Sequence, residues 1–344
     1  MAILIDPPLW PAHGTMWSHL VSDASHAELH VFARGLGVPR RGFDLDHYDV
    51  PAHLHAPAIA AGAEPVTTRV LLVRLRAAGL RVRPVDRHLA ARHQREDFLR
   101  AEWTTAGARV GAPYPAAWHA LGEDLLRRWS EPHRRYHDLV HLQDVLLALD
   151  QLSDDVAPAS GGPPASTPPT TIPSAVVLAA FFHDAVYDAV PGRDERRSAA
   201  LAQRELTAAG LPAALAEDVA RLVLTTAPAS GADSRCDAVD DDAARPHDAA
   251  LLRDAALLRD ADLAILAAGP KRYAAYAAAV RAEYAHVPEA DFRRGRAAIL
   301  QGFLDLPWIF ATAAGRERWE VRARDNVARE VAELAGWPHV HNER

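Results

Sequence analysis

The first 86 residues alternate short apolar runs with amphipathic ones. AILI at 2–5 has the length and apolar character of a buried strand, and RVRPV at 81–85 is also typical of a strand. The segments at 26–37 and 67–80 repeat apolar residues at helical spacing, and each carries a glycine near its end, where helices commonly terminate. This pattern predicts a small α/β domain over residues 1–86.

After this domain the pattern changes twice. Residues 87–114 are mixed and charged, and we interpret them as a linker with some helix. From Pro115 onward, segments rich in Ala, Leu and Arg repeat apolar positions with a helical period, which predicts an all-helical domain over 115–344. Two polar segments, 154–174 and 227–248, are expected to be exposed insertions between helices. The predicted fold class is therefore α+β multidomain, a small α/β domain followed by an all-α domain.

Composition agrees with two folded domains and narrows the choice of partners. A chain of 344 residues with 49% hydrophobic and 24% charged residues can bury two cores. The net charge of -7 argues against a surface that coats nucleic acid. The sequence has no long apolar run and no secretion-signal pattern, and the single Cys236 excludes an internal disulfide framework. We therefore expect a cytoplasmic protein with neither nucleic-acid nor membrane partners.

Histidines recur at intervals of four in EPHRRYHDLVHLQDVL, residues 131–146. On a helix this spacing would place His133, His137 and His141 on one face, with two aspartates nearby. Histidine is a mediocre helix former, so helix propensity does not account for the repetition. We therefore expect some of these imidazoles to have a chemical role.

A second candidate site follows the apolar run SAVVLAAFF, which ends in His183 and Asp184. Burial makes an unpartnered imidazole and carboxylate costly, and a metal ion could satisfy both. A mixed histidine and carboxylate set suits Mn, Fe or Zn, and Mg where more oxygen ligands are present. The alternative is a hydrogen-bonded core histidine followed by an aspartate that caps the next segment.

The order of these residues resembles a known superfamily. His141, then His183-Asp184, then Asp260 or Asp262 follow the H…HD…D order of the HD superfamily of metal-dependent phosphohydrolases. Five segments between about 118 and 335 carry the resemblance to a bacterial branch of predicted HD phosphohydrolases. They are YHDLVHLQDVL, FFHDAVYDAVPGRDERRSA, RDADLAIL, RAEY and ARDNVARE.

The resemblance implies a metal ligand set of His141, His183, Asp184 and one aspartate of the Asp260/Asp262 pair. The ion would be divalent, with Mn, Mg, Fe, Co, Ni and Zn not distinguished. Side chains at i and i+2 of a helix face about 200° apart, so we expect only one of the pair to be a ligand. We favour Asp260 and keep Asp262 as the alternative.

Catalytic roles are implied in the same way. Tyr136-His137-Asp138…His141 resembles the Tyr-His-Asn…His motif of cyclic nucleotide phosphodiesterases, which makes His137 the candidate general acid. Asp184 would act in catalysis as well as in metal binding. Glu195 would orient water or a ligand, or alternatively would only suit the dipole of a helix that Asp194 caps. Phosphate contacts could come from cationic side chains of the C-terminal helices, namely Lys271, Arg272, Arg281, Arg296 and Arg324.

One departure from the family pattern concerns a histidine. Relatives carry a His shortly after a Thr on the helix before the last aspartate, whereas here TTAPASG follows Thr225-Thr226 and His247 appears only after the insertion. We expect His247 to be exposed, so a second metal or a phosphate contact is in question.

The implied activity is hydrolysis of a phosphate ester in a small molecule, a nucleotide or a related metabolite. Two alternatives remain, a regulatory module that binds metal and nucleotide without turnover and an iron-dependent oxygenase of HD type. The sequence fixes neither the substrate nor the metal.

The N-terminal domain resembles a small bacterial domain family of unknown function, DUF4031, over residues 1 to about 86. The family supplies no chemistry to carry over, and the segment has no Gly-rich phosphate loop or GxSxG nucleophile motif. Its polar residues could form a site or could only cap loops, so we assign it no activity. The residues that recur in the family pattern are Asp6, His13, Trp17, His19, Asp23, His47, Tyr48 and Asp49.

Overall fold

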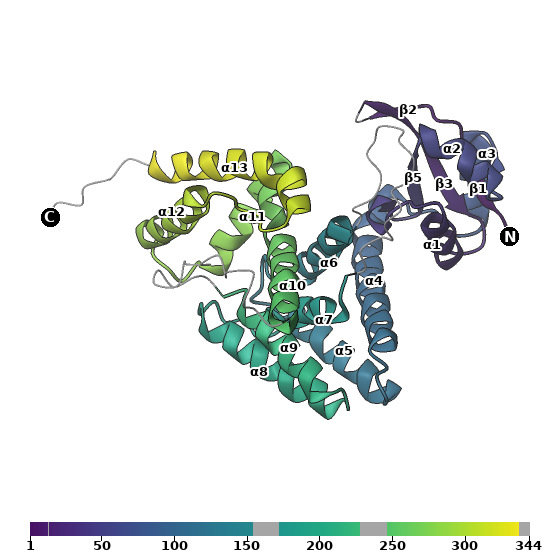
Figure 1. Ribbon diagram of the computed structural model, residues 1–344. Coiled ribbons are helices and arrows are strands. Elements are labelled where there is room, and N and C mark those ends of the chain that lie inside the picture. The colour runs from purple at the N-terminus through teal and green to yellow at the C-terminus, as the bar shows by residue number, and fades with distance from the viewer. Residues whose placement is uncertain (13, 154–171, 228–245, 337–344) are drawn as a thin grey trace. The chain divides into compact units, whose positions relative to one another are not determined.

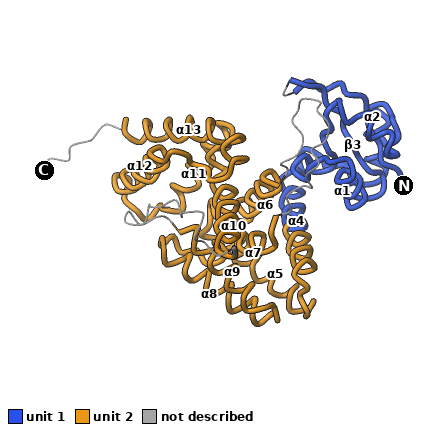
Figure 2. The backbone as a smooth tube through the Cα atoms, in the orientation of Figure 1, with its two compact units in different colours: residues 1–97 blue, residues 98–344 orange. Residues whose placement is uncertain are grey.

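The computed structural model describes residues 1–12, 14–153, 172–227 and 246–336 (Figure 1). The chain packs as two compact units, residues 1–97 and the part from Phe98 onward (Figure 2). We call them the first and the second unit. His13, Cys236 and most of the two expected insertions lie outside the described residues.

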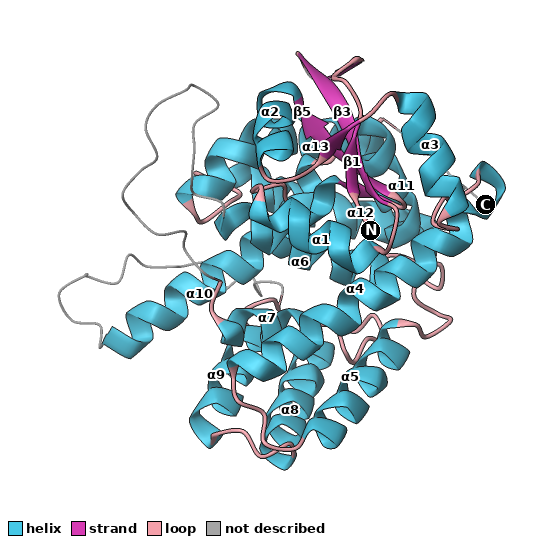
Figure 3. Ribbon diagram, turned by 90° about the vertical axis from the view of Figure 1, so that its right-hand side faces the viewer, coloured by secondary structure: helices cyan, strands magenta, loops and turns pink. Residues whose placement is uncertain are grey.

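A small mixed sheet organises the first unit (Figure 3). The strand order is β4-β5-β3-β1-β6, with β2 paired to β3. All pairs are antiparallel except β1 with β6. The strands are β1 (Ile3–Ile5), β2 (Trp10–Ala12), β3 (Thr15–Ser22), β4 (Phe43–Asp44), β5 (His47–Pro51) and β6 (Glu64–Pro65).

Helices cover both faces of this sheet. Alternate residues of β1 point to opposite faces, as strand geometry requires. Ile3 and Ile5 pack with α1 (His26–Gly35) and α2 (Ala52–Ala60), whereas Leu4 packs with α3 (Thr68–Ala77). The first unit therefore has two apolar layers, one on each side of the sheet.

The structure confirms the predicted strand at 2–5 and the two predicted helices at 26–37 and 67–80. The prediction of a strand at 81–85 is wrong. Arg81 and the backbone N–H of Val82 instead donate to Asp46, and a short 3₁₀ helix, η2 (Pro84–Asp86), follows. The central strands β3 and β5 were not predicted, because their polar and histidine positions obscure the apolar alternation.

The segment expected to be a linker forms one long helix, α4 (Arg87–Arg109). Its second half belongs to the core of the second unit, where Trp103 stacks on Trp118 with ring centroids 4.2 Å apart. Each indole N–H donates to the backbone carbonyl of the other tryptophan. Residues 98–109 are therefore structural rather than connecting.

The described residues of the second unit contain helices and no strand. Its core surrounds α7, in which every residue from Val176 to Phe182 is buried. Among the described residues, no helix combines the length and the apolar character that a membrane span requires. The remaining helices are α5 (Pro115–Trp129), α6 (Leu139–Ser153), α8 (Arg193–Ala208), α9 (Ala213–Leu224), α10 (Pro246–Leu263), α11 (Pro270–Glu283), α12 (Glu289–Asp305) and α13 (Ala313–Ala335), with a 3₁₀ turn η3 (Ala264–Ala267) after α10.

Candidate metal centre

The histidine-rich stretch is a turn followed by a helix, not a continuous helix. Residues 131–138 are non-helical, and α6 begins at Leu139. Asp138 Oδ1 accepts the backbone N–H groups of Val140 (2.7 Å) and His141 (3.3 Å), which is the contact of a helix cap. The expectation that three imidazoles share a helix face is therefore wrong, and only His141 lies on the helix.

His183 lies at the end of α7, where its ring is held by the helix itself. Nδ1 donates to the carbonyl of Ala180 at 2.8 Å, so the lone pair of the neutral ring is on Nε2. His183 is 1% exposed. Its Nε2 therefore faces the protein interior rather than water.

Three elements bring their ligand-type atoms together in front of His183. His141 Nε2 of α6 lies 3.3 Å from His183 Nε2 and 3.1 Å from Asp262 Oδ1 of α10. His183 Nε2 lies 3.7 Å from Asp262 Oδ1 and 3.3 Å from Asp184 Oδ2. We call His141, His183, Asp184 and Asp262 the metal cluster.

The donor atoms of the metal cluster fit a cation. The two Nε2 atoms and the carboxylate oxygens face one another at a site where both imidazoles are almost fully buried, and one cation could bind all of them. Burial alone opposes ionisation of Asp262, but its bond with His141 and the charge of His183 lower its pKa to about 2. The same contact raises the pKa of His141 in spite of burial. Two nitrogens and carboxylate oxygens suit Mn, Fe, Co, Ni or Zn.

The structure does not bring Asp260 to the metal cluster, and our preference for it over Asp262 is corrected. Asp260 is fully buried, and its two oxygens accept the backbone N–H groups of Ala311 (2.7 Å) and Thr312 (2.8 Å) and the Thr312 hydroxyl. Burial raises the pKa of this carboxyl group. Asp260 therefore holds the segment that leads into α13.

His137 lies beside the metal cluster with a fixed ring orientation. Its Nδ1 lies 2.6 Å from Glu283 Oε2, and its Nε2 lies 3.9 Å from Asp184 Oδ2. The ring stacks on Tyr187 with centroids 4.3 Å apart. Because a carboxylate can only accept, Nδ1 carries a proton and Nε2 is the atom that can exchange one near the cluster.

Glu283, at the end of α11, is a residue that sequence reasoning missed. Its Oε1 accepts the backbone N–H groups of Arg135, Tyr136 and His137 at 2.8–2.9 Å, and its Oε2 also accepts the hydroxyl of Tyr187. Burial raises its pKa, but these bonds outweigh burial and lower the pKa to about 2. The only signal in the sequence was its place in the RAEY segment.

Arg134 was missed as well, because a lone arginine in a polar stretch predicts a solvated side chain. Its guanidinium is buried and donates to the carbonyls of His137 (2.9 Å) and Asp184 (2.8 Å). It thereby ties the turn before α6 to the turn after α7. These are the two turns that carry the candidate acid and a candidate metal ligand.

Glu195 lies in the first turn of α8 with one carboxylate oxygen, Oε2, buried and without a hydrogen-bond partner among the described residues. Burial raises its pKa, and the charge of Asp184 acts in the same direction. We had considered Asp194 as the residue that caps α8, but the structure shows otherwise. The cap is Gly192 at φ +74°, and Asp194 instead accepts backbone N–H groups of the preceding loop.

A pocket of about 170 Å³ opens beside His141. Arg135 and Arg272 supply its positive charge, and Tyr136 and Tyr276 supply aromatic surface. Burial raises the pKa of Tyr136 well above its usual value, so its hydroxyl stays protonated. The remaining lining residues are Asp138, Val140, Ile265, Ala275 and Ala279.

Of the candidate phosphate contacts, Arg272 lines this pocket and also pairs with Asp144. Arg296 and Arg324 are engaged with Glu330 and Glu320. Arg281 pairs with Glu289 and donates to the carbonyls of Tyr284 and Val287. Lys271 is exposed in the first turn of α11.

Two further histidines lie away from the metal cluster. His247 is exposed at the start of α10, where its Nε2 lies 3.2 Å from Asp218 Oδ1. His133 is half exposed and contacts the carbonyl of Tyr187. The structure therefore supplies no replacement for the family histidine among the described residues.

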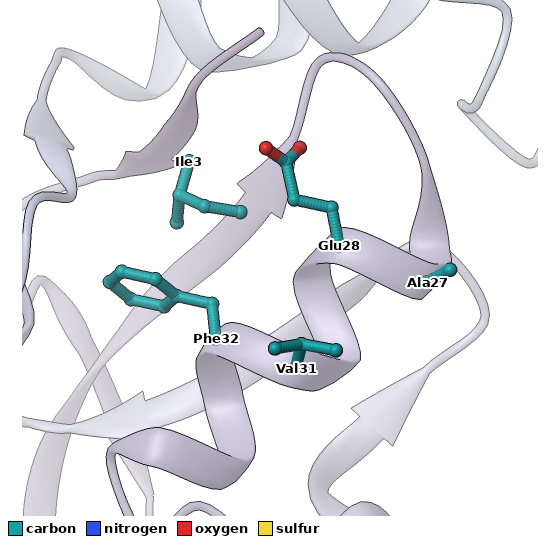
Figure 4. Close-up of a pocket in the computed structure, with 5 residues that line it drawn as sticks. All are labelled: Ile3, Ala27, Glu28, Val31 and Phe32. Carbon is teal, nitrogen blue, oxygen red and sulfur yellow. The ribbon is translucent and has the colours of Figure 1, made fainter.

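A second depression lies on the first unit between β1 and α1 (Figure 4). Its lining is apolar apart from Glu28, whose carboxylate accepts the Ser22 hydroxyl at 2.6 Å. The other lining residues are Ile3, Ala27, Val31 and Phe32. It offers no group with evident chemistry.

Comparison with known proteins gives a family match for the N-terminal part of the chain. No curated protein and no solved structure matches the chain. The match that was found does not reach the metal cluster, so the HD resemblance of the second unit stays a proposal. Residues 3–78 match the family model described as "Protein of unknown function (DUF4031)".

Proposed function

We propose that the second unit is a metal-dependent phosphohydrolase that acts on a phosphate ester in a small molecule, a nucleotide or a related metabolite. The observation that carries the proposal is the convergence of two imidazole Nε2 atoms and two carboxylates beside His137, an imidazole whose Nδ1 is held by Glu283. The order His141, His183-Asp184, Asp262 along the chain agrees with the HD pattern.

Each group has a distinct part in this proposal. His141, His183, Asp184 and Asp262 would hold a divalent cation, which supplies Lewis acidity by acidifying water and offsetting charge on phosphoryl oxygens. His137 delivers a proton from Nε2 to the departing oxygen of the ester.

The pocket beside His141 supplies the binding surface. Arg135 and Arg272 offer guanidinium groups for the phosphate, and the apolar side of the pocket suits a base or another flat group. Glu195 places a second carboxyl group near Asp184, with a pKa raised by burial, so it can hold a proton close to the reacting groups.

The proposal is tested with the full chain, purified and loaded in turn with Mn, Mg, Fe, Co, Ni or Zn. A panel of nucleotides and phosphomonoesters is screened for phosphate release. We expect turnover that requires the metal, and we expect the His183→Ala/Asp184→Ala variant to lose one equivalent of bound metal and all turnover. His119→Ala removes an exposed histidine of the same unit and serves as the matched control.

Two results would overturn the proposal. Full turnover in the His183→Ala/Asp184→Ala variant would show that the metal cluster is not the active site. Bound iron with O₂ consumption and no phosphate release would replace hydrolysis by the oxygenase alternative.

A test of the proton-transfer role changes Glu283→Gln. The neutral amide no longer offsets the charge of an imidazolium that carries protons on both nitrogens, so His137 holds the Nε2 proton that it must deliver less readily. We expect kcat to fall by about 10²–10⁴, the range that general acid catalysis contributes, with bound metal unchanged. Glu289→Gln, an exposed carboxylate on α12, should leave kcat unchanged.

A further inference from the structure

The first unit contains a second cluster of ligand-type atoms, on the central strands β3 and β5. His19 of β3 lies directly opposite Asp49 of β5 in the antiparallel register. His47 precedes Asp49 by two residues, so both side chains point to the same face of the sheet. One ligand atom from each of the three residues lies within 4.8 Å of the others.

Both imidazoles are oriented by buried carboxylates. His19 Nδ1 lies 3.0 Å from Asp6 Oδ2, and His47 Nδ1 lies 2.8 Å from Asp46 Oδ1. Asp6 and Asp46 are at most 1% exposed. Each Nδ1 therefore donates, and each Nε2 faces Asp49, where it can bind a metal ion once it carries no proton.

The two orienting carboxylates are themselves fixed. Asp6 accepts the backbone N–H of His19 and the hydroxyl of Thr68, and Asp46 accepts from Arg81 and the backbone N–H of Val82. Carboxylates that bind the outer nitrogen of a histidine recur at protein metal sites, where they fix the ring and strengthen the ligand.

The distances between the ligand atoms favour an ion over direct hydrogen bonds. Asp49 Oδ1 lies 3.5 Å from His47 Nε2 and 4.0 Å from His19 Nε2, too far for good hydrogen bonds. Ligands that bind one ion at about 2.0–2.2 Å are separated by roughly 3–3.5 Å from one another, so a small inward movement completes the site. Asp6, Asp46 and Asp49 place three carboxylates around the two rings, and Arg81 pairs with Asp46.

We propose that the first unit binds a divalent transition-metal ion through His19 Nε2, His47 Nε2 and a carboxylate oxygen of Asp49. Two imidazoles and one carboxylate select Zn, Fe, Co or Ni over Mg or Ca, which prefer oxygen ligands. The Asp49 side chain is 50% exposed, so positions opposite the protein ligands face solvent and can take water or an anionic ligand. Three protein ligands with open positions are typical of catalytic rather than structural sites.

The test uses the full chain carrying His183→Ala/Asp184→Ala, so that the proposed phosphohydrolase site no longer contributes. Co²⁺ is the probe, because its visible absorption reports nitrogen and oxygen coordination, and bound metal is counted after desalting. We expect one equivalent of Co²⁺ per chain. The ring of Trp10 lies 5.2 Å from that of His19, so Co²⁺ should also quench a part of the fluorescence that Trp10→Phe removes.

Variants then assign the ligands. Asp49→Asn changes a half-exposed side chain and should weaken Co²⁺ binding at least about tenfold without loss of fold. His19→Ala/His47→Ala should abolish it, with circular dichroism as the check on folding. His53→Ala, an exposed histidine of the same unit, is the matched control and should bind as the parent does.

Two outcomes overturn the inference. One is a parent chain that binds no Co²⁺, and the other is binding that persists in both ligand variants. Neither outcome bears on hydrolysis by the second unit, which is measured in the chain with its own cluster intact.

Discussion

Asp260 and Asp262, two residues apart on α10, contact different parts of the second unit. Asp262 is part of the metal cluster, while both oxygens of Asp260 accept hydrogen bonds from the backbone of Ala311 and Thr312 and from the Thr312 hydroxyl. The helical spacing led us to expect only one of them beside the two histidines, and in the structure only Asp262 lies near His141 and His183. The spacing could not indicate which, because the answer depends on where the chain places Thr312 far along the sequence.

This division predicts different losses in two variants. Asp262→Asn should lose metal from the second unit, and in the metal-free protein it should also lose the stabilisation that the contact with His141 gives the carboxylate. Asp260→Asn should keep the metal and lose about 2–3 kcal/mol, because its amide N–H₂ would face donors in a buried site. Metal content and urea unfolding in chelator measure the two effects. The opposite assignment would follow if Asp260→Asn alone lost metal.

At the scale of elements, the contact of α4 with α5 depends on glycine. A Cβ at Gly107 would lie 2.2 Å from the Trp118 indole, and one at Gly122 would lie 2.4 Å from that of Trp103. The two glycines thus allow the tryptophans to stack. Hydrophobic periodicity does not register such a contact, which is why residues 98–109 were interpreted as part of a linker.

We expect Gly107→Ala to lower the free energy of unfolding by about 1–3 kcal/mol, because the methyl group overlaps a buried ring. Gly302→Ala on α12 is the control, since a Cβ there meets nothing within 4 Å. It should raise the free energy by about 0.5–1 kcal/mol through helix propensity. Urea unfolding measures both, and equal effects of the two changes would contradict this account of the packing.

Glu283, at the end of α11, should make the free energy of unfolding depend on pH in the acidic range. Glu283 has a folded pKa of about 2, below its unfolded value, so the unfolded chain binds more protons as the pH falls. Its contribution, about 3 kcal/mol, is complete above pH 4.5 and is lost toward pH 2. Urea unfolding at pH 7 and pH 3 should show a smaller difference in Glu283→Gln than in the parent. An unchanged difference would contradict the role of Glu283.

At the scale of the molecule, the sequence indicated two domains and the helical class of the second, because long amphipathic segments are read from local periodicity. The HD-like order led us to expect His141, His183 and Asp184 to lie together, and the structure places them close to one another. Sequence reasoning missed Glu283 and Arg134, whose partners are distant backbone groups or turns that no local pattern records. The cluster of His19, His47 and Asp49 depends on the pairing of β3 with β5, and neither strand was predicted.

The two units have separate hydrophobic cores. The first unit packs around its sheet and the second around α7, so we expect two unfolding transitions in calorimetry. Metal at about 100 times its Kd should stabilise each unit that binds it by about 2.7 kcal/mol, because it binds only the folded state. His183→Ala/Asp184→Ala should abolish the metal-induced shift of one transition, and His19→Ala/His47→Ala that of the other. If either double variant abolished both shifts, the two sites would not belong to separately folding units.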